Sequence, residues 1–160
     1  MTVISDTGPL IYLVRIGHLT LLKEKFGCIT IPEEVYNEAC VKGEGKPGSK
    51  EIKEADWIEI KEVKGDFLID VLRLELDLGE SEVIALAKQT DAETVVIDEK
   101  IPREKLKALG FEVAGTVGIL VWASKEGLIP DLKGSLDDLR KKGMWISDEL
   151  YRRALKMVEE

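Results

Sequence analysis

Short runs of apolar and β-branched residues alternate along the chain with segments whose apolar residues recur at helical spacing. Runs typical of strands lie at residues 2–5, 28–31, 57–60, 94–98 and 111–113. Helical patterns follow Pro9 and Pro32, lie at about 66–76, 79–90 and 102–109, and occur three times after residue 116. This alternation favours a mostly parallel sheet of about four to five strands that helices cover on both faces. The pattern therefore predicts an α/β fold with three layers, α/β/α.

Glycine and proline residues indicate where these elements begin and end. Gly17 is expected to separate two short helices, and Gly27 to end the second. The segment 43–49 is rich in glycine and predicts a loop. Residues 57–60 alternate between apolar and polar side chains, which indicates a half-exposed strand near a sheet edge. Ser147 is the expected N-cap of the last helix.

The length of 160 residues fits a single domain, with a core at about 1–125 and a helical extension at about 126–160. Hydrophobic residues make up 44% of the chain and charged residues 34%, as in soluble globular proteins. No apolar stretch approaches the roughly 20 residues that span a bilayer, and the N-terminus lacks the pattern of a signal peptide. A cytoplasmic protein without a membrane partner is therefore expected.

The charge balance and the cysteines narrow the classes of function. A formal net charge of −8 argues against broad, non-specific binding of nucleic acid. It leaves room for a nuclease whose carboxylates bind a metal ion. Cys28 and Cys40 form no CxxC motif and no cluster with histidine, so neither a zinc site nor a disulfide is expected.

Two of the predicted strands end in an aspartate, Asp6 and Asp98. In open α/β sheets, ligands bind at the carboxyl ends of the strands, where the strand order reverses. If the two strands are neighbours, both carboxylates line the same crevice. Asp6 has a second interpretation of equal weight, as the N-cap of the helix that follows it.

Helical phase selects further acidic residues. Glu80 is in phase with the apolar positions of 83–87, whereas Glu82 lies on nearly the opposite face. Since a buried charge is costly unless it is paired, Glu80 is the better candidate for a site. The alternative is that both glutamates lie there only because the positive N-terminal end of the helix favours negative charge. Glu38 is in phase with 31–35, and a solvated helix face is an equally good interpretation of it.

Four carboxylates that meet would repel one another strongly. A single pair at about 4 Å costs about 4 kcal/mol at an effective dielectric constant of about 20. A hard divalent cation relieves this repulsion, and oxygen ligands without histidine or cysteine favour Mg²⁺ or Mn²⁺. Such an ion activates water and stabilises an in-line phosphoryl transition state. The acidic residues therefore indicate hydrolysis of phosphodiester bonds.

The chain resembles the PIN-domain family, and more closely its prokaryotic, VapC-like nucleases. The resemblance rests on the segments SDTGPLIYL, IPEEVYNEA, GESEVIALA, VVIDEK, GTVGIL and WISDELY, which occur in the family order and cover nearly the whole chain. It implies a PIN-like α/β/α fold with extra C-terminal helices. It also implies that an acidic quartet binds Mg²⁺ or Mn²⁺ and catalyses the reaction: Asp6, Glu38, Glu80 and Asp98.

The resemblance assigns further roles around this quartet. Thr7 matches the small hydroxyl residue that supports the first acid, while Glu82 and Glu99 are substitutes for Glu80 and Asp98. The implied function is that of a metal-dependent endoribonuclease acting on RNA, which serves as the toxin of a toxin–antitoxin pair in related proteins. An antitoxin protein and a homodimer are the implied protein partners.

Basic and aromatic residues add candidates for RNA binding. Arg103 is the candidate for gripping a phosphate, because guanidinium geometry suits bidentate contacts. The nearby lysines are better explained by a solvated helix face. Trp122, Trp145 and Tyr151 could stack on bases, but core or interface positions are the expectation for them.

Three rival functions are weighed against the ribonuclease. An aspartic protease shares Asp-Thr-Gly at 6–8 but needs two such aspartates in an all-β framework. A phosphotransferase or phosphatase that uses a strand-end aspartate as nucleophile is expected to have a second aspartate two residues later. This chain has Gly8 at that position. A PIN-like protein that binds RNA or a partner without significant catalysis remains the main alternative. The four filled acidic positions favour an active site.

Overall fold

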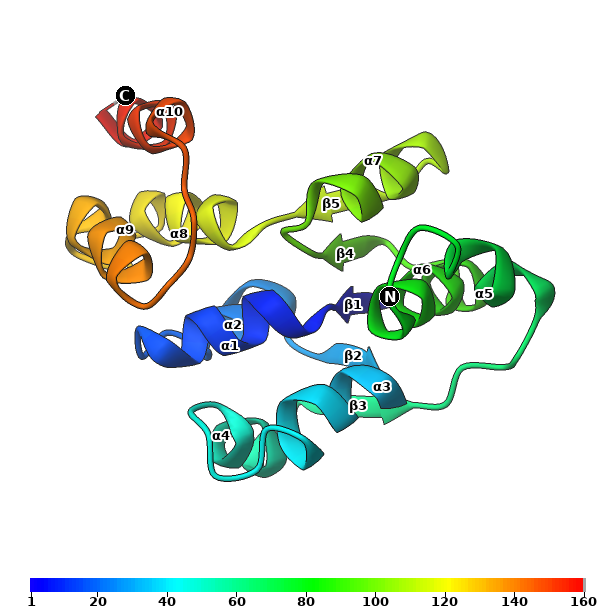
Figure 1. Ribbon diagram of the computed structural model, residues 1–160. Coiled ribbons are helices and arrows are strands. Elements are labelled where there is room, and N and C mark those ends of the chain that lie inside the picture. Colours follow the sequence, from blue (N-terminus) through cyan, green and yellow to red (C-terminus); the bar gives the residue numbers. More distant parts are fainter. Residues whose placement is uncertain (160) are drawn as a thin grey trace.

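The computed structural model in Figure 1 describes residues 1–159 of the chain. Its centre is an entirely parallel five-stranded sheet with the order β3-β2-β1-β4-β5. The strands are β1 (Val3–Ser5), β2 (Ile29–Pro32), β3 (Ile58–Lys61), β4 (Thr94–Val96) and β5 (Glu112–Ala114). The predicted parallel sheet of four to five strands is therefore confirmed.

Helices cover both faces of this sheet, so the chain has the predicted three layers. Figure 1 shows α1, α2, α4 and α8 on one side and α5, α6 and α7 on the other. The helices are α1 (Thr7–Arg15), α2 (Leu21–Phe26), α3 (Glu33–Tyr36), α4 (Ser49–Glu54), α5 (Phe67–Leu72), α6 (Leu78–Thr90), α7 (Lys100–Ala108), α8 (Thr116–Lys125), α9 (Leu132–Lys141) and α10 (Asp148–Glu159). A π-helical turn, η1 (Asn37–Val41), follows α3 directly.

The strand order reverses at β1. The chain continues from β1 to β2 on one side and returns to place β4 on the other. All three residues of β1 are buried, because a central parallel strand is covered on both faces. The edge strand β3 is mostly exposed, as its alternating pattern predicted. The reversal places the ends of β1 and β4 side by side, where α/β proteins bind ligands.

Several element boundaries differ from the sequence-based expectations. The first helix begins at Thr7, so that Pro9 lies within its first turn, where a proline is tolerated. The helix expected after Pro32 ends after one turn and continues as η1. The pattern also missed α4, which lies between the predicted loop and β3.

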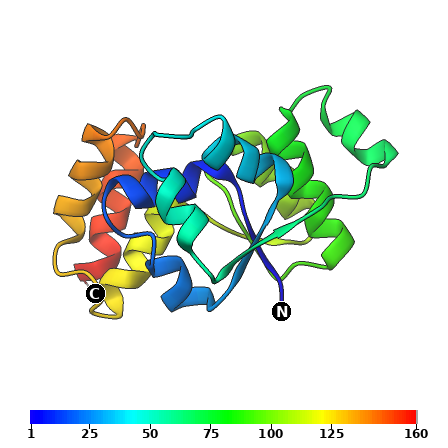
Figure 2. The same ribbon diagram turned by 90° about the horizontal axis from the view of Figure 1, so that it is seen from below.

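The last three helices form one end of the molecule, as Figure 2 shows. Helix α8 packs against α1 and α2, and α9 and α10 pack on α8. Ser147 caps α10 as predicted, since its hydroxyl accepts a hydrogen bond from the Leu150 N–H. Trp122 and Tyr151 are half-buried, but Trp145 is 84% exposed and is not part of the core. Within residues 1–159, no helix is both long enough and apolar enough to cross a membrane.

Candidate active site

Asp6 lies at the end of β1 and is only 7% exposed. Its backbone N–H donates to the carbonyl of Val96 on β4 (2.9 Å), which extends the pairing of the two strands. Although Asp6 occupies the N-cap position of α1, its side chain makes no capping hydrogen bond. Of the two interpretations that the sequence left open, the structure therefore does not support capping.

The surroundings of Asp6 disfavour its charged form. Burial is the largest cause that raises the pKa of its carboxyl group, to about 7. The negative charges of Glu80, Glu38 and Asp77 add to the rise, while the N–H of Thr7 opposes it. Three carboxylates, of which Asp77 and Glu80 are close neighbours in the chain, thus act electrostatically on Asp6.

Glu38 reaches this site from the π-helical turn η1. Such turns insert one extra residue into a helix and are frequent at functional sites. The hydroxyl of Thr7 donates to Glu38 Oε2 (2.9 Å). Thr7 was expected to support the first acid, but its hydroxyl holds Glu38 and only its N–H bears on Asp6. Burial and the charges of Asp77 and Glu34 raise the pKa of Glu38, against the effects of Thr7 and Lys42.

A glycine makes room for Glu38. A Cβ atom at Gly79, in the first turn of α6, would collide with the Glu38 carboxylate. Gly79 therefore lets the backbone of α6 and this carboxylate approach each other closely. The role of Gly79 was not predicted, because a glycine inside a helical pattern gives no indication of the distant side chain that it faces.

Glu80 and Asp77 form a capping box at the start of α6. The Glu80 N–H donates to Asp77 Oδ1 (2.8 Å), and the Asp77 N–H donates to Glu80 Oε1 (3.2 Å). Burial, followed by the charges of Asp77, Glu99 and Glu38, raises the pKa of Glu80, and the Asp77 N–H opposes the rise. Asp77 was not predicted to be a site residue, although Asp-x-x-Glu before an apolar run is a recognisable capping signal.

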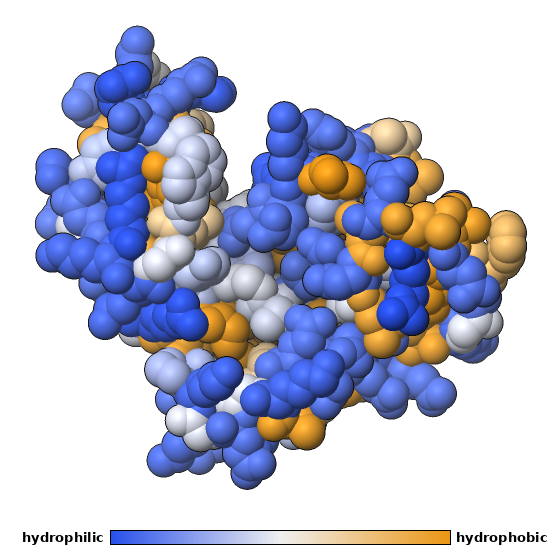
Figure 3. All heavy atoms as spheres, in the orientation of Figure 1, coloured by the Kyte–Doolittle hydropathy of each residue, from blue (hydrophilic) through white to orange (hydrophobic). Residues whose placement is uncertain are grey.

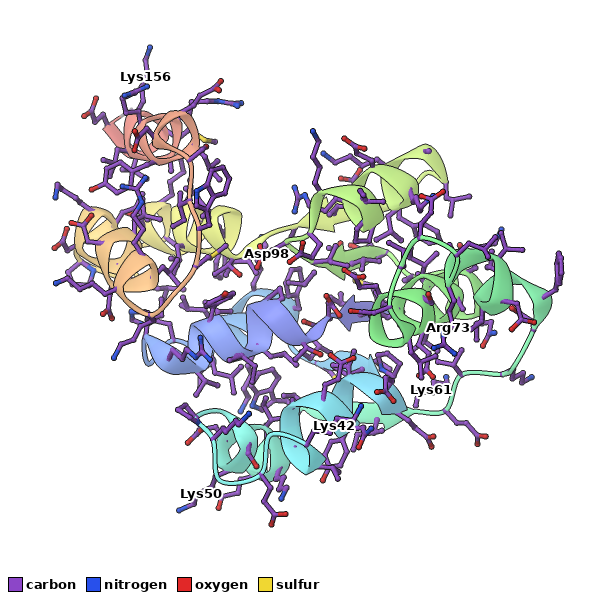
Figure 4. The ribbon with its side chains drawn as sticks, in the orientation of Figure 1. Lys42, Lys50, Lys61, Arg73, Asp98 and Lys156 are labelled. Carbon is purple, nitrogen blue, oxygen red and sulfur yellow. The ribbon has the colours of Figure 1, made fainter. Side chains whose placement is uncertain are left out.

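Asp98 lies two residues beyond β4 and next to α1. Its Oδ1 accepts a hydrogen bond from the Thr116 N–H (2.8 Å), and its Oδ2 accepts one from the Thr116 hydroxyl (2.7 Å). A Cβ at Gly8 would lie 4.0 Å from Asp98 Oδ2, which places Asp98 beside the first turn after Asp6. Figure 4 shows Asp98 between α8 and α1. Thr116 was not recognised as a site residue from the sequence.

The substitute acids occupy different places. Glu82 Oε1 accepts a hydrogen bond from the Glu34 N–H (3.2 Å), and burial with the charges of Glu34 and Glu33 raises its pKa. Glu82 therefore lies at the start of α3, away from the group around Asp6. Glu99 is the exposed N-cap of α7 and bears electrostatically on Glu80.

Arg103 lies close to Asp98 but is engaged by the backbone. Its Nη1 donates to the carbonyl of Ile97 (2.7 Å). A Cβ at Gly115 would meet Arg103 Nη1 at 2.9 Å and Asp98 Oδ1 at 3.0 Å, so both side chains border this glycine. The guanidinium thus places positive charge beside the acidic site.

The donor set suits a hard divalent cation. Aspartate, glutamate and threonine supply only oxygen ligands, which Mg²⁺ and Mn²⁺ prefer. The close approach at Gly79 leaves space for the Glu38 carboxylate beside α6. As the side chains stand, no three Asp, Glu, His or Cys residues within 1–159 are arranged to hold a metal ion. Glu38, Glu80 and Asp98 each accept a hydrogen bond from a protein donor instead.

Comparison with known proteins agrees with this architecture. A search among curated proteins finds no match to the sequence. A family model described as a PIN domain matches residues 2–160. Because this match covers nearly the whole chain, the protein belongs to the PIN-domain family, whose members are generally nucleases.

Proposed function

We propose that this protein is a Mg²⁺- or Mn²⁺-dependent endoribonuclease. The observation that carries the proposal is the convergence of Glu38, Asp77 and Glu80 on the buried Asp6. Such a concentration of negative charge favours the binding of a cation. Asp98, at the neighbouring strand end, completes the set of residues that would hold the metal.

The residues of the chain would divide the work between binding and orientation. Asp6, Glu38, Glu80 and Asp98 would hold the cation, which supplies positive charge to a phosphoryl group and lowers the pKa of water. Thr7 orients the Glu38 carboxylate, and Thr116 orients both oxygens of Asp98. In the hydrolysis, a water oxygen bonds to phosphorus as one P–O ester bond breaks, and the leaving oxygen gains a proton.

Cleavage of RNA by protein freed of contaminating nucleases tests the proposal. Wild type should cleave with Mn²⁺ or Mg²⁺ and stop with EDTA, and Asp6→Asn or Asp98→Asn should slow cleavage at least about 100-fold. Asp91→Asn is the matched control, because Asp91 is exposed and its left-handed backbone tolerates asparagine. Equal cleavage by all four proteins would contradict the proposal.

A binding measurement separates the nuclease from a PIN-like protein without catalysis. Mn²⁺ should raise the melting temperature of wild type, since a ligand that binds only the folded state stabilises it. Asp98→Asn should reduce that rise, and Asp91→Asn should retain it. Retention of the full rise in Asp98→Asn would exclude Asp98 from the metal site.

The acidic site also supports the expectation of an antitoxin partner. An inserted segment with a basic side chain would neutralise the charges around Asp6. Expression of the protein alone should arrest growth, and co-expression with the product of the neighbouring gene should relieve the arrest and yield a complex.

A homodimer is proposed as well; exposed apolar residues on α5 and α10 offer surface for it. Light scattering at micromolar concentration checks the mass.

A further inference from the structure

A groove of about 810 Å³ separates the C-terminal helices from β5 and α7. Asp98 and Arg103 line it on the side of the sheet, and Trp122 and Trp145 line it on the side of the C-terminal helices. Figure 3 shows the surface hollowed between these two parts of the molecule. Its volume lies within the range of pockets that hold small organic ligands, about 300–1,000 Å³. The groove thus leads from the proposed active site to two tryptophans.

Trp145 is the most exposed large hydrophobic side chain on the wall of this groove, at 84%. The next residue, Ile146, is buried, and its carbonyl accepts a hydrogen bond from Arg140 Nη2 (2.7 Å). The backbone beside Trp145 is therefore anchored, while its indole faces solvent. An indole in this position offers a flat apolar face that nothing in residues 1–159 covers.

Trp122 adds a second aromatic face, and Lys25 brings charge to it. The Lys25 ammonium lies 4.6 Å from the centre of the Trp122 ring, which is cation–π geometry. Both residues line the groove. Aromatic surface and positive charge therefore occur together on this wall.

Lys100 and Arg103 extend the positive charge along the opposite wall towards Asp98. Within residues 1–159, the ion pairs involve neither of them nor Lys25. Most lysines and arginines of this described part of the chain likewise form no ion pair, but these three lie together on the walls of one groove. Their charges are available to an anionic ligand, with Asp98 and Glu99 as the acidic residues of the same groove.

We propose that this groove binds unpaired nucleotides of an RNA strand, with a base stacked on Trp145 and backbone phosphates facing Lys100 and Arg103. The inference rests on the proposed function, whose site lies at the Asp98 end of the groove. Aromatic faces with cations that track a backbone are how proteins bind single strands without reading sequence. A duplex cannot stack its paired bases on Trp145, so the groove selects single-stranded substrate.

Binding is measured in EDTA, by anisotropy of a fluorescein-labelled single-stranded RNA of about 12 nucleotides. Trp145→Ala should weaken binding about ten-fold, and Trp145→Phe should restore part of the loss. Phe67→Ala is the matched control, because Phe67 is 79% exposed on α5 and outside the groove. Lys100→Ala should weaken binding and flatten its salt dependence, whereas Lys50→Ala, exposed on α4 (Figure 4), should not.

The outcomes separate this inference from the proposed function, because binding in EDTA needs neither metal nor cleavage. If RNA binding depends on Trp145 but no metal-dependent cleavage occurs, the groove is supported as an RNA-binding site and the proposed nuclease activity is contradicted. If the wild-type protein cleaves RNA and Trp145→Ala binds RNA as tightly as wild type does, only the proposed role of the groove is contradicted. Equal binding of a duplex of the same length would overturn it too. The proposed role of the groove would also be contradicted if light scattering shows a dimer that Trp145→Ala converts to a monomer, since a second copy of the chain would then cover the indole.

Discussion

Asp6 and Asp98 end neighbouring strands in the same way but occupy opposite environments. Asp6 is buried, makes no capping hydrogen bond and lies among three other carboxylates, so its charge is disfavoured. Asp98 receives two hydrogen bonds from Thr116, one on each carboxylate oxygen, which fix the orientation of its side chain. The same strand-then-aspartate pattern thus yields one carboxyl group whose charge is disfavoured by burial and one that Thr116 orients.

The largest expected effect of this difference is on the pH dependence of stability without metal. An unfolded aspartate has a pKa of about 4, and that of Asp6 is raised to about 7 in the folded protein. Between these values the folded state binds more protons than the unfolded state, so stability should fall as pH rises from 4 to 7. At pH 8, Asp6→Asn should be more stable than wild type by on the order of 3–4 kcal/mol.

Urea unfolding at pH 4, 6 and 8 in EDTA checks this expectation. At pH 4 Asp6→Asn and wild type should be about equally stable, because Asp6 is then protonated. An Asp6→Asn variant that is less stable than wild type at pH 8 would show that the carboxylate has a favourable partner, and the contrast with Asp98 would fail.

The second effect concerns the orientation of Asp98. Thr116→Val removes the hydroxyl that donates to Asp98 Oδ2 at nearly constant volume. Because loss of a group that orients a metal ligand typically costs 10–100-fold, RNA cleavage should slow by about that factor. Thr116→Ser, which keeps the hydroxyl, should restore most of the rate. If Thr116→Ser is as slow as Thr116→Val, the effect comes from packing and not from the hydrogen bond.

A smaller effect is expected on the stability of Asp98 variants. Asp98→Asn replaces charge-assisted hydrogen bonds with neutral ones, which should lower the free energy of unfolding at pH 8 by about 1 kcal/mol. The sign is opposite to that for Asp6→Asn, and Asp91→Asn should change little. Denaturant unfolding of the three variants side by side measures the comparison. Stabilisation by Asp98→Asn would mean that repulsion outweighs its hydrogen bonds.

The smallest effect distinguishes two glycines in helices. Gly118→Ala has open space around its new Cβ and should stabilise α8 by about 0.5–1 kcal/mol. Gly79→Ala should lack this gain, because its Cβ would meet the Glu38 carboxylate, and it should slow cleavage. The melting temperatures and the rates of RNA cleavage of both variants, compared with those of wild type, test this difference. A full stability gain with unchanged cleavage in Gly79→Ala would show that Glu38 moves freely.

The sequence predicted the fold well because its signals are local. Apolar runs such as Thr94–Val96 and capping residues such as Ser147 act within a few positions of themselves. The role of Asp6 could be stated only as a choice between two interpretations. Its outcome depends on burial and on the charges of Glu38 and Asp77, which are distant in the chain. These are tertiary effects that a single sequence does not contain.

The residues that were missed show the same limit. Thr116 begins a helix, and nothing near it in the sequence indicates that it will hold Asp98, eighteen residues away. Trp145 was expected in the core or an interface; its exposure on a groove wall excludes the core position. Helical phase did separate Glu80 from Glu82, since the two glutamates lie on different sides of α6 and meet different neighbours.

The π-helical turn η1 makes the acidic site sensitive to the length of the chain. Each residue turns an α-helix by about 100°, and a π-turn contains one residue more than the α-helix it interrupts. Loss of one codon within 37–41 would turn the segment back into regular helix and change the direction in which its side chains point. The buried strands would be untouched, so a one-codon deletion there should displace Glu38 from Thr7 while the fold is retained.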